Sequence, residues 1–152
     1  MTTPMGFPPE SLRHGVSNAR SAVNKAALIH DTINSYRLDL LALTETWISA
    51  DQSRAVTHDI APAGFSVLHH YRTTGRGRGV AMIYRSDLAV SEVTLHSVHD
   101  FFEALAVKLI TGCGRTNIAV LYRPPSLSVQ GTPVGTFCNQ FTRLFRSQAR
   151  FD

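Results

Sequence analysis

The clearest pattern along the chain is a short, almost unbroken apolar run that begins at Leu38 and ends in Thr44-Glu45. A run of this length is typical of a β-strand that is covered on both faces, so we expect a strand from Leu38 to Glu45. Glu45 then lies at the C-terminal edge of the sheet, where open α/β sheets place their ligands. A lone Glu at such an edge is ordinarily a rim charge or a salt-bridge partner. Whether Glu45 has a functional role therefore depends on its neighbours along the chain.

Apolar residues at helical spacing occur on both sides of the middle of the chain. The first helix is expected to start after Ser21 as N-cap and to end near Arg37. Its buried stripe consists of Ala22, Ala26, Ile29, Ile33 and Tyr36. A weak strand from Leu12 to Asn18 precedes it, so strand, helix and strand follow one another as in a β-α-β unit. A second helix is predicted at the end of the chain from Phe137, Phe141, Leu144, Phe145 and Gln148.

Between these parts, a polar connection from Ser49 to Gly64 leads into five strands that are joined mostly by short turns. The first two read as a hairpin, and the last stops at Pro124-Pro125, because proline has no N–H for a strand ladder. The expected ranges are 65–71, 80–85, 88–95, 102–110 and 117–122. This order predicts an α/β fold with a mixed, largely antiparallel sheet and flanking helices. Residues 1–11 are predicted to be a flexible arm, and 12–152 one domain.

Composition fits one globular domain, since the chain has 152 residues of which 43% are hydrophobic. The two cysteines have neither the count nor the spacing of a zinc site or a disulfide framework, and no apolar run is long enough to span a membrane. We therefore expect an intracellular protein, with the nucleus as one candidate location. The formal charge is +4, from 13 Arg and 2 Lys against 11 acidic residues. Arginine suits phosphate contacts, but a coding bias explains the same count equally well.

Basic residues also gather in two parts of the chain, which makes two local basic surfaces plausible. One group lies on the predicted hairpin and comprises Arg72, Arg76, Arg78 and Arg85, and the other lies on the last helix and comprises Arg143, Arg146 and Arg150. Four histidines, His69, His70, His96 and His99, show no metal-ligand spacing tied to a carboxylate, so we interpret them as strand or loop residues.

Four local patterns occur in a fixed order: Ser17-Asn18-Ala19-Arg20-Ser21 with Asn24-Lys25, Leu41-Ala42-Leu43-Thr44-Glu45-Thr46-Trp47, Gly75-Arg76-Gly77-Arg78-Gly79-Val80-Ala81, and Ala119-Val120-Leu121-Tyr122-Arg123-Pro124-Pro125. Each is weak by itself, but together they resemble the endonuclease/exonuclease/phosphatase family, and within it the endonuclease domains of non-LTR retrotransposons. The resemblance runs from about Val16 to Phe145. It implies a four-layer α/β/β/α sandwich and cleavage of phosphate esters with Mg²⁺ or Mn²⁺.

The resemblance also implies roles for three residues. Glu45 matches the metal-binding glutamate, and Asn18 matches the amide that supports the scissile phosphate and the metal region, so both are candidate metal ligands. Tyr122 matches the tyrosine whose hydroxyl donates to a phosphate oxygen. Simpler interpretations stay open, because Asn18 also fits an Asx turn before the helix and Tyr122 fits a strand-end aromatic residue.

DNA is the partner that the resemblance implies, with phosphate contacts from Arg20, Lys25, Arg76, Arg78 and Arg123. Taken singly, each of these residues is more simply interpreted as a solvated surface charge. The family pattern usually has Gly where this chain has Arg78. The loop from Gly75 to Gly79 joins two strands, so it is not a nucleotide-binding fingerprint. Glu103 fits the strand pattern but receives no role.

The family's later Asp-x-Asn and Asp-His pairs are missing from these 152 residues. Because such groups act as a unit, we expect a truncated domain that is inactive alone. A half sandwich should also leave a sheet face uncovered and self-associate through it. Two alternatives are a noncatalytic nucleic-acid-binding module and a fragment without a selected role.

Overall fold

The computed structural model describes residues 11–70, 78–95, 102–123 and 139. Within these ranges the chain forms two helices and seven strands in two sheets. In chain order they are β1 (His14–Asn18), α1 (Ala26–Tyr36), β2 (Leu40–Thr44), α2 (Ser53–Ile60), β3 (Phe65–His70), β4 (Val80–Arg85), β5 (Ala89–Val93), β6 (Glu103–Thr111) and β7 (Gly114–Tyr122). The predicted C-terminal helix, of which only residue 139 is described, and residues 1–10 of the predicted arm lie outside these ranges.

The first sheet has the strand order β1-β2-β4-β3. β1 and β2 are parallel, as the predicted β-α-β unit requires, and the other two pairings are antiparallel. All five residues of β2 are buried, which confirms the interpretation of its apolar run as a strand covered on both faces. In the register of β1 and β2, Asn18 lies opposite Thr44, so the last residues of both strands meet at one edge.

The second sheet is antiparallel, with the order β5-β6-β7. Its long strands β6 and β7 form a hairpin in which Glu103 pairs with Tyr122 at one end and Thr111 with Gly114 at the other. The residue pattern alone predicted one mixed sheet, whereas the strands after β4 form a sheet of their own. All five strands predicted after residue 64 are present, with ends that differ by up to three residues.

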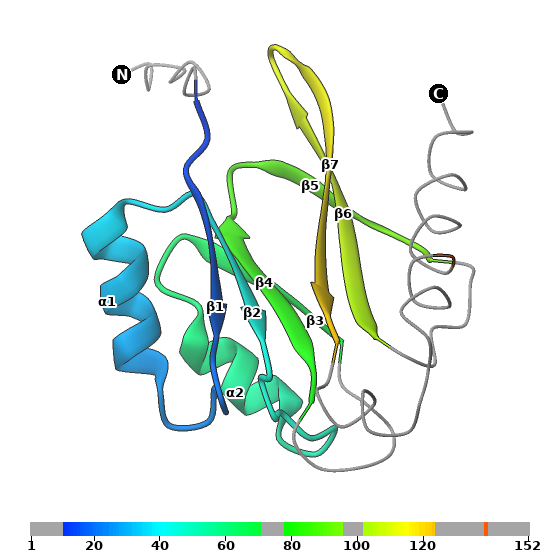
Figure 1. The fold of residues 1–152 in the computed structure, drawn as a ribbon. Coiled ribbons are helices and arrows are strands. Elements are labelled where there is room, and N and C mark those ends of the chain that lie inside the picture. Colours follow the sequence, from blue (N-terminus) through cyan, green and yellow to red (C-terminus); the bar gives the residue numbers. More distant parts are fainter. Residues whose placement is uncertain (1–10, 71–77, 96–101, 124–138, 140–152) are drawn as a thin grey trace.

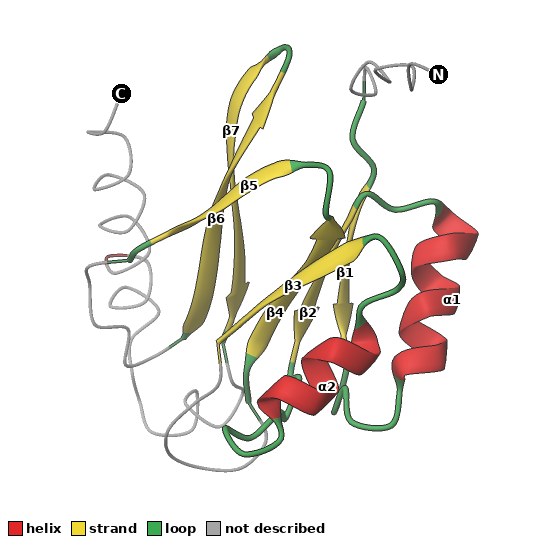
Figure 2. Ribbon diagram, turned by 180° about the vertical axis from the view of Figure 1, so that it is seen from behind, coloured by secondary structure: helices red, strands yellow, loops and turns green. Residues whose placement is uncertain are grey.

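The two sheets and the helices form three layers (Figures 1 and 2). One core lies between the helices and the first sheet, where Ile33 and Ile60 pack with Leu43 and Ile83. The other core lies between the two sheets. Its buried members are Leu40, Ala42, Val80, Met82, Leu105, Val107 and Val120. These are the first three layers of the expected α/β/β/α sandwich.

This second core overturns the expectation of an uncovered sheet face. The face of β2 and β4 opposite the helices is covered by β6 and β7 of the same chain, and Met82, Leu105 and Val107 on the two sheets are fully buried. The partner sheet was expected from residues beyond this chain, whereas β5, β6 and β7 supply it. The physical reason given for self-association therefore no longer holds.

The start of α1 also differs from the expectation. The helix begins at Ala26, with Lys25 as a cap residue that makes no side-chain capping bond, and Ser21 is not the N-cap. Backbone bonds hold the preceding segment against the end of β2, since Ser21 N–H donates to the Glu45 carbonyl and Ala22 N–H to the Thr46 carbonyl, both at 2.8 Å. Ala22 is buried as predicted, but it reaches the core from this segment rather than from a helix.

The connection predicted from Ser49 to Gly64 contains a short helix, α2, which the sequence analysis missed. It has one fully buried side chain, Ile60, and the partly buried Val56 packs beside it. A helix with so few apolar contacts gives almost no periodic signal, so its sequence resembles a polar loop. No helix in the described ranges is long and apolar enough to cross a membrane.

Candidate functional site

Three side chains from the ends of β1, β2 and β7 meet at one oxygen atom. Asn18 is the last residue of β1, Glu45 directly follows β2, and Tyr122 is the last residue of β7. The side-chain amide of Asn18 donates to Glu45 Oε1 at 3.0 Å, and the hydroxyl of Tyr122 donates to the same oxygen at 2.6 Å. The three predicted site residues are therefore in contact, although 27 and 77 residues separate Glu45 from its two partners.

Glu45 begins the short backbone segment of residues 45–47, where the chain leaves β2, and we call this segment the Glu45 turn. Glu45 and Trp47 have φ angles of 52° and 53°, in the left-handed region that non-glycine residues seldom adopt. Such a backbone persists only where surrounding contacts hold it. Here Thr46 is completely buried, and its N–H donates to the Gly79 carbonyl at 3.1 Å. The carboxylate thus projects from a fixed part of the backbone.

Asn18 makes two kinds of contact at the same time. Its Oδ1 accepts the Arg20 backbone N–H at 3.1 Å, which is the Asx-turn geometry, while its Nδ2 donates to Glu45. The simple structural role and the predicted site role are therefore compatible. Because Oδ1 already accepts a backbone bond, Asn18 supports the carboxylate of Glu45 in this arrangement instead of offering an oxygen beside it.

Hydrogen bonds, and for Tyr122 also burial, set the protonation states of Glu45 and Tyr122. The bond from Tyr122, then the bond from Asn18 and the charge of Arg20, lower the pKa of Glu45, so this carboxyl is ionised at neutral pH. Burial, together with the hydrogen bond to Glu45 and the charge of that carboxylate, raises the pKa of Tyr122 to about 12. Tyr122 consequently remains a neutral hydroxyl that can donate a hydrogen bond across the physiological pH range.

The residues present fit a hard divalent cation in a limited way. Among the described residues no group of three His, Cys, Asp or Glu side chains could enclose a metal ion. Mg²⁺ commonly keeps several water ligands and takes only one or two protein carboxylates together with substrate phosphate. Glu45, which is partly exposed and ionised, meets that requirement as a single anchor. Asn18 as a direct ligand stays a prediction.

The predicted phosphate-binding residues are placed differently from one another. Arg20 is exposed beside Asn18, and its charge acts on Glu45. Lys25 uses its ammonium group on the carbonyls of Ala19 and Arg20, at 2.6 and 2.9 Å. Arg123 is half-buried next to Tyr122.

The other two predicted phosphate-binding residues, Arg76 and Arg78, belong to the predicted basic hairpin. Arg78 contributes its carbonyl to Trp47 N–H, whereas Arg76 lies outside the described residues. Arg85 is not a solvated basic group, because its guanidinium contacts Asp39 and Asp87. Of that hairpin, Arg78 is therefore the described residue whose side chain stays a candidate for DNA.

The pattern of the whole chain can now be compared with known proteins. A model described as "Endonuclease/Exonuclease/phosphatase family" matches residues 12–148, which is most of the chain. The chain belongs to the endonuclease/exonuclease/phosphatase family. No curated protein sequence matches it.

One solved structure similar to the chain is an AP endonuclease from Leishmania major, with a TM-score of 0.55 and 18% sequence identity. The likeness covers 81% of this chain and 43% of that enzyme. At this identity it shows the shared fold. The chain spans less than half the length of the enzyme that it matches.

Two residues near the site of this family member were not assigned a role from the sequence. Glu103, the first residue of β6, accepts the Gly79 N–H with Oε2 at 2.7 Å, and His69 on β3 contacts the Thr46 hydroxyl with Nε2 at 3.0 Å. The alternating pattern of β6 could have indicated Glu103, since this residue continues the inward-facing series of Leu105, Val107 and Leu109. His69 gave no comparable signal, because its position in β3 looks like any strand histidine.

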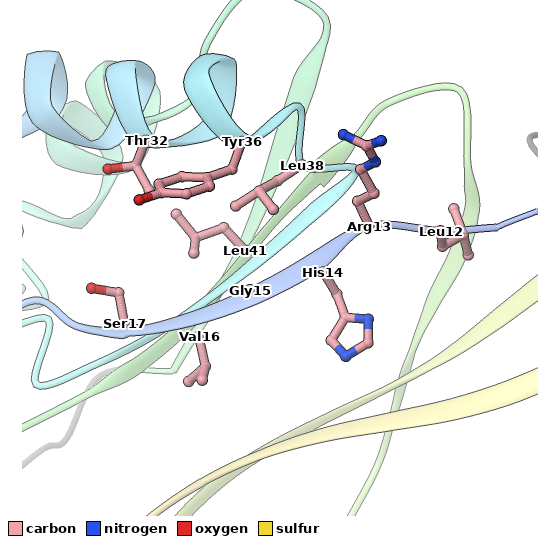
Figure 3. Close-up of a pocket in the computed structure, with 10 residues that line it drawn as sticks. All are labelled: Leu12, Arg13, His14, Gly15, Val16, Ser17, Thr32, Tyr36, Leu38 and Leu41. Atoms are coloured by element: carbon pink, nitrogen blue, oxygen red, sulfur yellow. The ribbon is translucent and has the colours of Figure 1, made fainter.

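A separate cleft of about 560 Å³ runs beside β1 (Figure 3). Tyr36, Leu38 and Leu41 lie on the α1 side of the strand, while His14 and Val16 point to the opposite side (Figure 3). The cleft reaches Ser17 but includes neither Asn18 nor Glu45 among its lining residues. The contacts around Glu45 are therefore distinct from this cleft.

Proposed function

We propose that these residues form the metal- and phosphate-binding part of a DNA endonuclease of the retroelement type, and that the 152-residue chain by itself does not hydrolyse DNA. The observation that supports the proposal best is the convergence of Asn18, Glu45 and Tyr122 on one carboxylate oxygen. All three were expected at a phosphodiesterase site, and they come from three different strands.

Each group has a distinct part in this proposal. Glu45 holds Mg²⁺ or Mn²⁺, which supplies positive charge to a phosphate ester when it is bound. Asn18 orients the carboxylate through its amide. Tyr122 remains protonated, because its pKa is raised to about 12. Its single O–H, which donates to Glu45 in this structure, would turn to a non-bridging phosphate oxygen when the substrate binds.

DNA is the proposed partner because several basic residues lie close to these three along the chain or just before a neighbouring strand. Arg20 and Arg123 flank the site along the chain, and Arg76 and Arg78 precede β4, whose neighbour β2 ends at the site. The ammonium of Lys25 donates to two backbone carbonyls, so its proposed contact with phosphate requires it to donate to the phosphate as well. The formal charge of +4 also favours the binding of a polyanion such as DNA.

The proposal of inactivity rests on the residues available for activating water. The expected Asp-x-Asn and Asp-His pairs do not occur in the 152 residues. Neither Tyr122 nor Asn18 can act as a general base at neutral pH, and Glu45 is assigned to the metal. Because catalytic groups that act as a unit lose most of their rate together, the remaining groups should bind without turnover.

A plasmid assay tests this function. Purified protein is incubated with supercoiled plasmid and Mn²⁺, and nicking is followed together with DNA binding over a range of salt concentrations. We expect no nicking and a DNA affinity that falls steeply with salt, with Mn²⁺-dependent binding weakened in Glu45→Gln. The matched control is Asp31→Asn, which neutralises an exposed carboxylate on α1.

Nicking that disappears in Glu45→Gln would show that the 152 residues suffice for turnover, against the proposal. Nicking that is equal in both proteins would identify a contaminating nuclease, and repeated purification would remove it. DNA binding that depends neither on Mn²⁺ nor on Glu45 would favour the noncatalytic nucleic-acid-binding module instead.

A further inference from the structure

We infer that Glu103 is a positioning residue for the Glu45 site: from the second sheet it holds the backbone segment that supports the Glu45 turn, and so fixes Glu45 relative to Tyr122. The inference rests on the proposed function for what the site does. The contacts that carry it are independent of that function, and none of them was expected from the sequence.

Glu103 occupies a position where a carboxylate is costly. It shares the inward face of β6 with Leu105, Val107 and Leu109, all of which are buried in the core. Its Oε1 is shielded from solvent, and its Oε2 accepts the Gly79 N–H at 2.7 Å. Removing a charged group from water is unfavourable unless polar contacts replace the lost hydration. A strand that needed only packing here would be served better by another apolar residue.

The hydrogen bond from Gly79 leads directly to the Glu45 turn. Residues 78–79, which we call the Gly79 segment, accept two backbone bonds from that turn: Thr46 N–H donates to the Gly79 carbonyl at 3.1 Å, and Trp47 N–H donates to the Arg78 carbonyl at 3.0 Å. On its other side the same segment donates to Glu103. Two backbone bonds and one charge-assisted bond therefore join Glu103 to the residues immediately after Glu45.

The Gly79 segment is packed so closely against Thr46 that the two cannot move independently of each other. Gly79 has a φ of +116°, and a Cβ built on it would lie 2.4 Å from the Thr46 hydroxyl oxygen. Thr46 itself is completely buried and contacts His69 through that hydroxyl. Because packed interiors transmit small shifts, a movement of the Gly79 segment must move Thr46 and the adjoining Glu45.

Glu103 is also tied to the other side of the site. In the β6–β7 ladder it lies opposite Tyr122, whose hydroxyl donates to Glu45 Oε1 at 2.6 Å. The contacts thus form a closed ring that runs from Glu45 through the Gly79 segment to Glu103, across the ladder to Tyr122, and back to Glu45. In this ring, the side chain of Glu103 is the contact that joins the second sheet to the Gly79 segment.

The competing explanation is that Glu103 merely stabilises the packing of the two sheets. Glu92 provides a matched control, because this β5 carboxylate joins the same sheets through His70 on β3 rather than through the Glu45 turn. A general effect of inter-sheet contacts would appear in Glu92→Ala as well. A positioning effect would be confined to Glu103 variants and would follow the geometry of the Gly79 bond.

The experiment measures Mn²⁺ affinity by the electron paramagnetic resonance signal of the free ion, and the Thr46, Trp47 and Tyr122 resonances by nuclear magnetic resonance without metal. Glu103→Gln keeps an oxygen that can accept the Gly79 N–H, whereas Glu103→Asp keeps the charge but is one methylene shorter. We expect Glu103→Gln to bind Mn²⁺ nearly as the native chain does. Glu103→Asp and Glu103→Ala should lose roughly tenfold in affinity and shift the three resonances.

The opposite order, with Glu103→Asp native-like and Glu103→Gln impaired, would overturn the inference, because charge rather than the bond to Gly79 would then matter. Equal losses in Glu92→Ala would also overturn it. If Glu103→Ala does not fold, the comparison of Gln and Asp variants still decides. Should the native chain fail to bind Mn²⁺, the proposed function fails, while the metal-free resonances still test the positioning role.

Discussion

Glu45 combines three properties directly after β2: an ionised carboxylate, a left-handed backbone and two side-chain donors to one oxygen. The donors lower its pKa, so the carboxylate keeps its charge at neutral pH. A single anionic oxygen pair held in this way is well suited to one hard cation that keeps most of its water ligands.

His69 gives a prediction at the same scale. Burial, and secondarily the neighbouring His70, lower the pKa of His69 to about 4 from its ordinary value near 6.5. A histidine that is held neutral in the folded state stabilises the fold fully above pH 6.5, and this contribution is lost as the pH falls toward 4. We expect the free energy of unfolding to fall by about 2 kcal/mol over that interval, after allowing for partial exposure.

Urea unfolding at several pH values measures this effect. His69→Gln should flatten the pH dependence between 6.5 and 4, whereas His58→Gln, which alters a highly exposed histidine on α2, should leave it unchanged. An equally steep loss of stability in His69→Gln would assign the acid sensitivity to other groups.

The elements show how far the sequence determined the fold. β2 and β4 were predicted well because their residues are apolar on both faces, which is the strongest local signal that a strand can give. α2 was missed because it depends on one buried side chain. The convergence of Asn18, Glu45 and Tyr122 was expected from the resemblance to the family. The role of Glu103 was not expected, since its contact with Gly79 joins two sheets that the residue pattern did not separate.

The dependence of α2 on Ile60 is itself testable. Ile60 is fully buried in the core between the helices and the first sheet, so Ile60→Ala removes its side-chain carbons beyond Cβ and leaves a cavity. We expect a loss of about 3 kcal/mol in the free energy of unfolding, against less than about 0.5 kcal/mol for Leu28→Ala on the exposed face of α1. Chemical denaturation measures both. Equal effects in the two variants would mean that α2 does not pack as described.

At the scale of the whole molecule, the chain builds both sheets of a sandwich within its own length. The first sheet is covered by helices on one face and by the second sheet on the other, and the site lies where strands from both sheets end. This arrangement explains why Tyr122, far from Glu45 in sequence, reaches it only when the two sheets pack correctly. Metal binding should consequently report on the packing of the sheets as well as on the carboxylate.

Paramagnetic broadening by Mn²⁺ tests the central claim most directly, because a bound ion broadens the resonances of nearby nuclei. Mn²⁺ is titrated into isotope-labelled protein, with Glu45→Gln and Asp31→Asn measured in parallel. We predict that the amide signals of Asn18 and of residues 45–47 and the ring signals of Tyr122 broaden first, that Asp31→Asn behaves alike, and that Glu45→Gln abolishes the effect. Broadening that is centred elsewhere on the molecule, or that persists unchanged in Glu45→Gln, would contradict a metal site at Glu45.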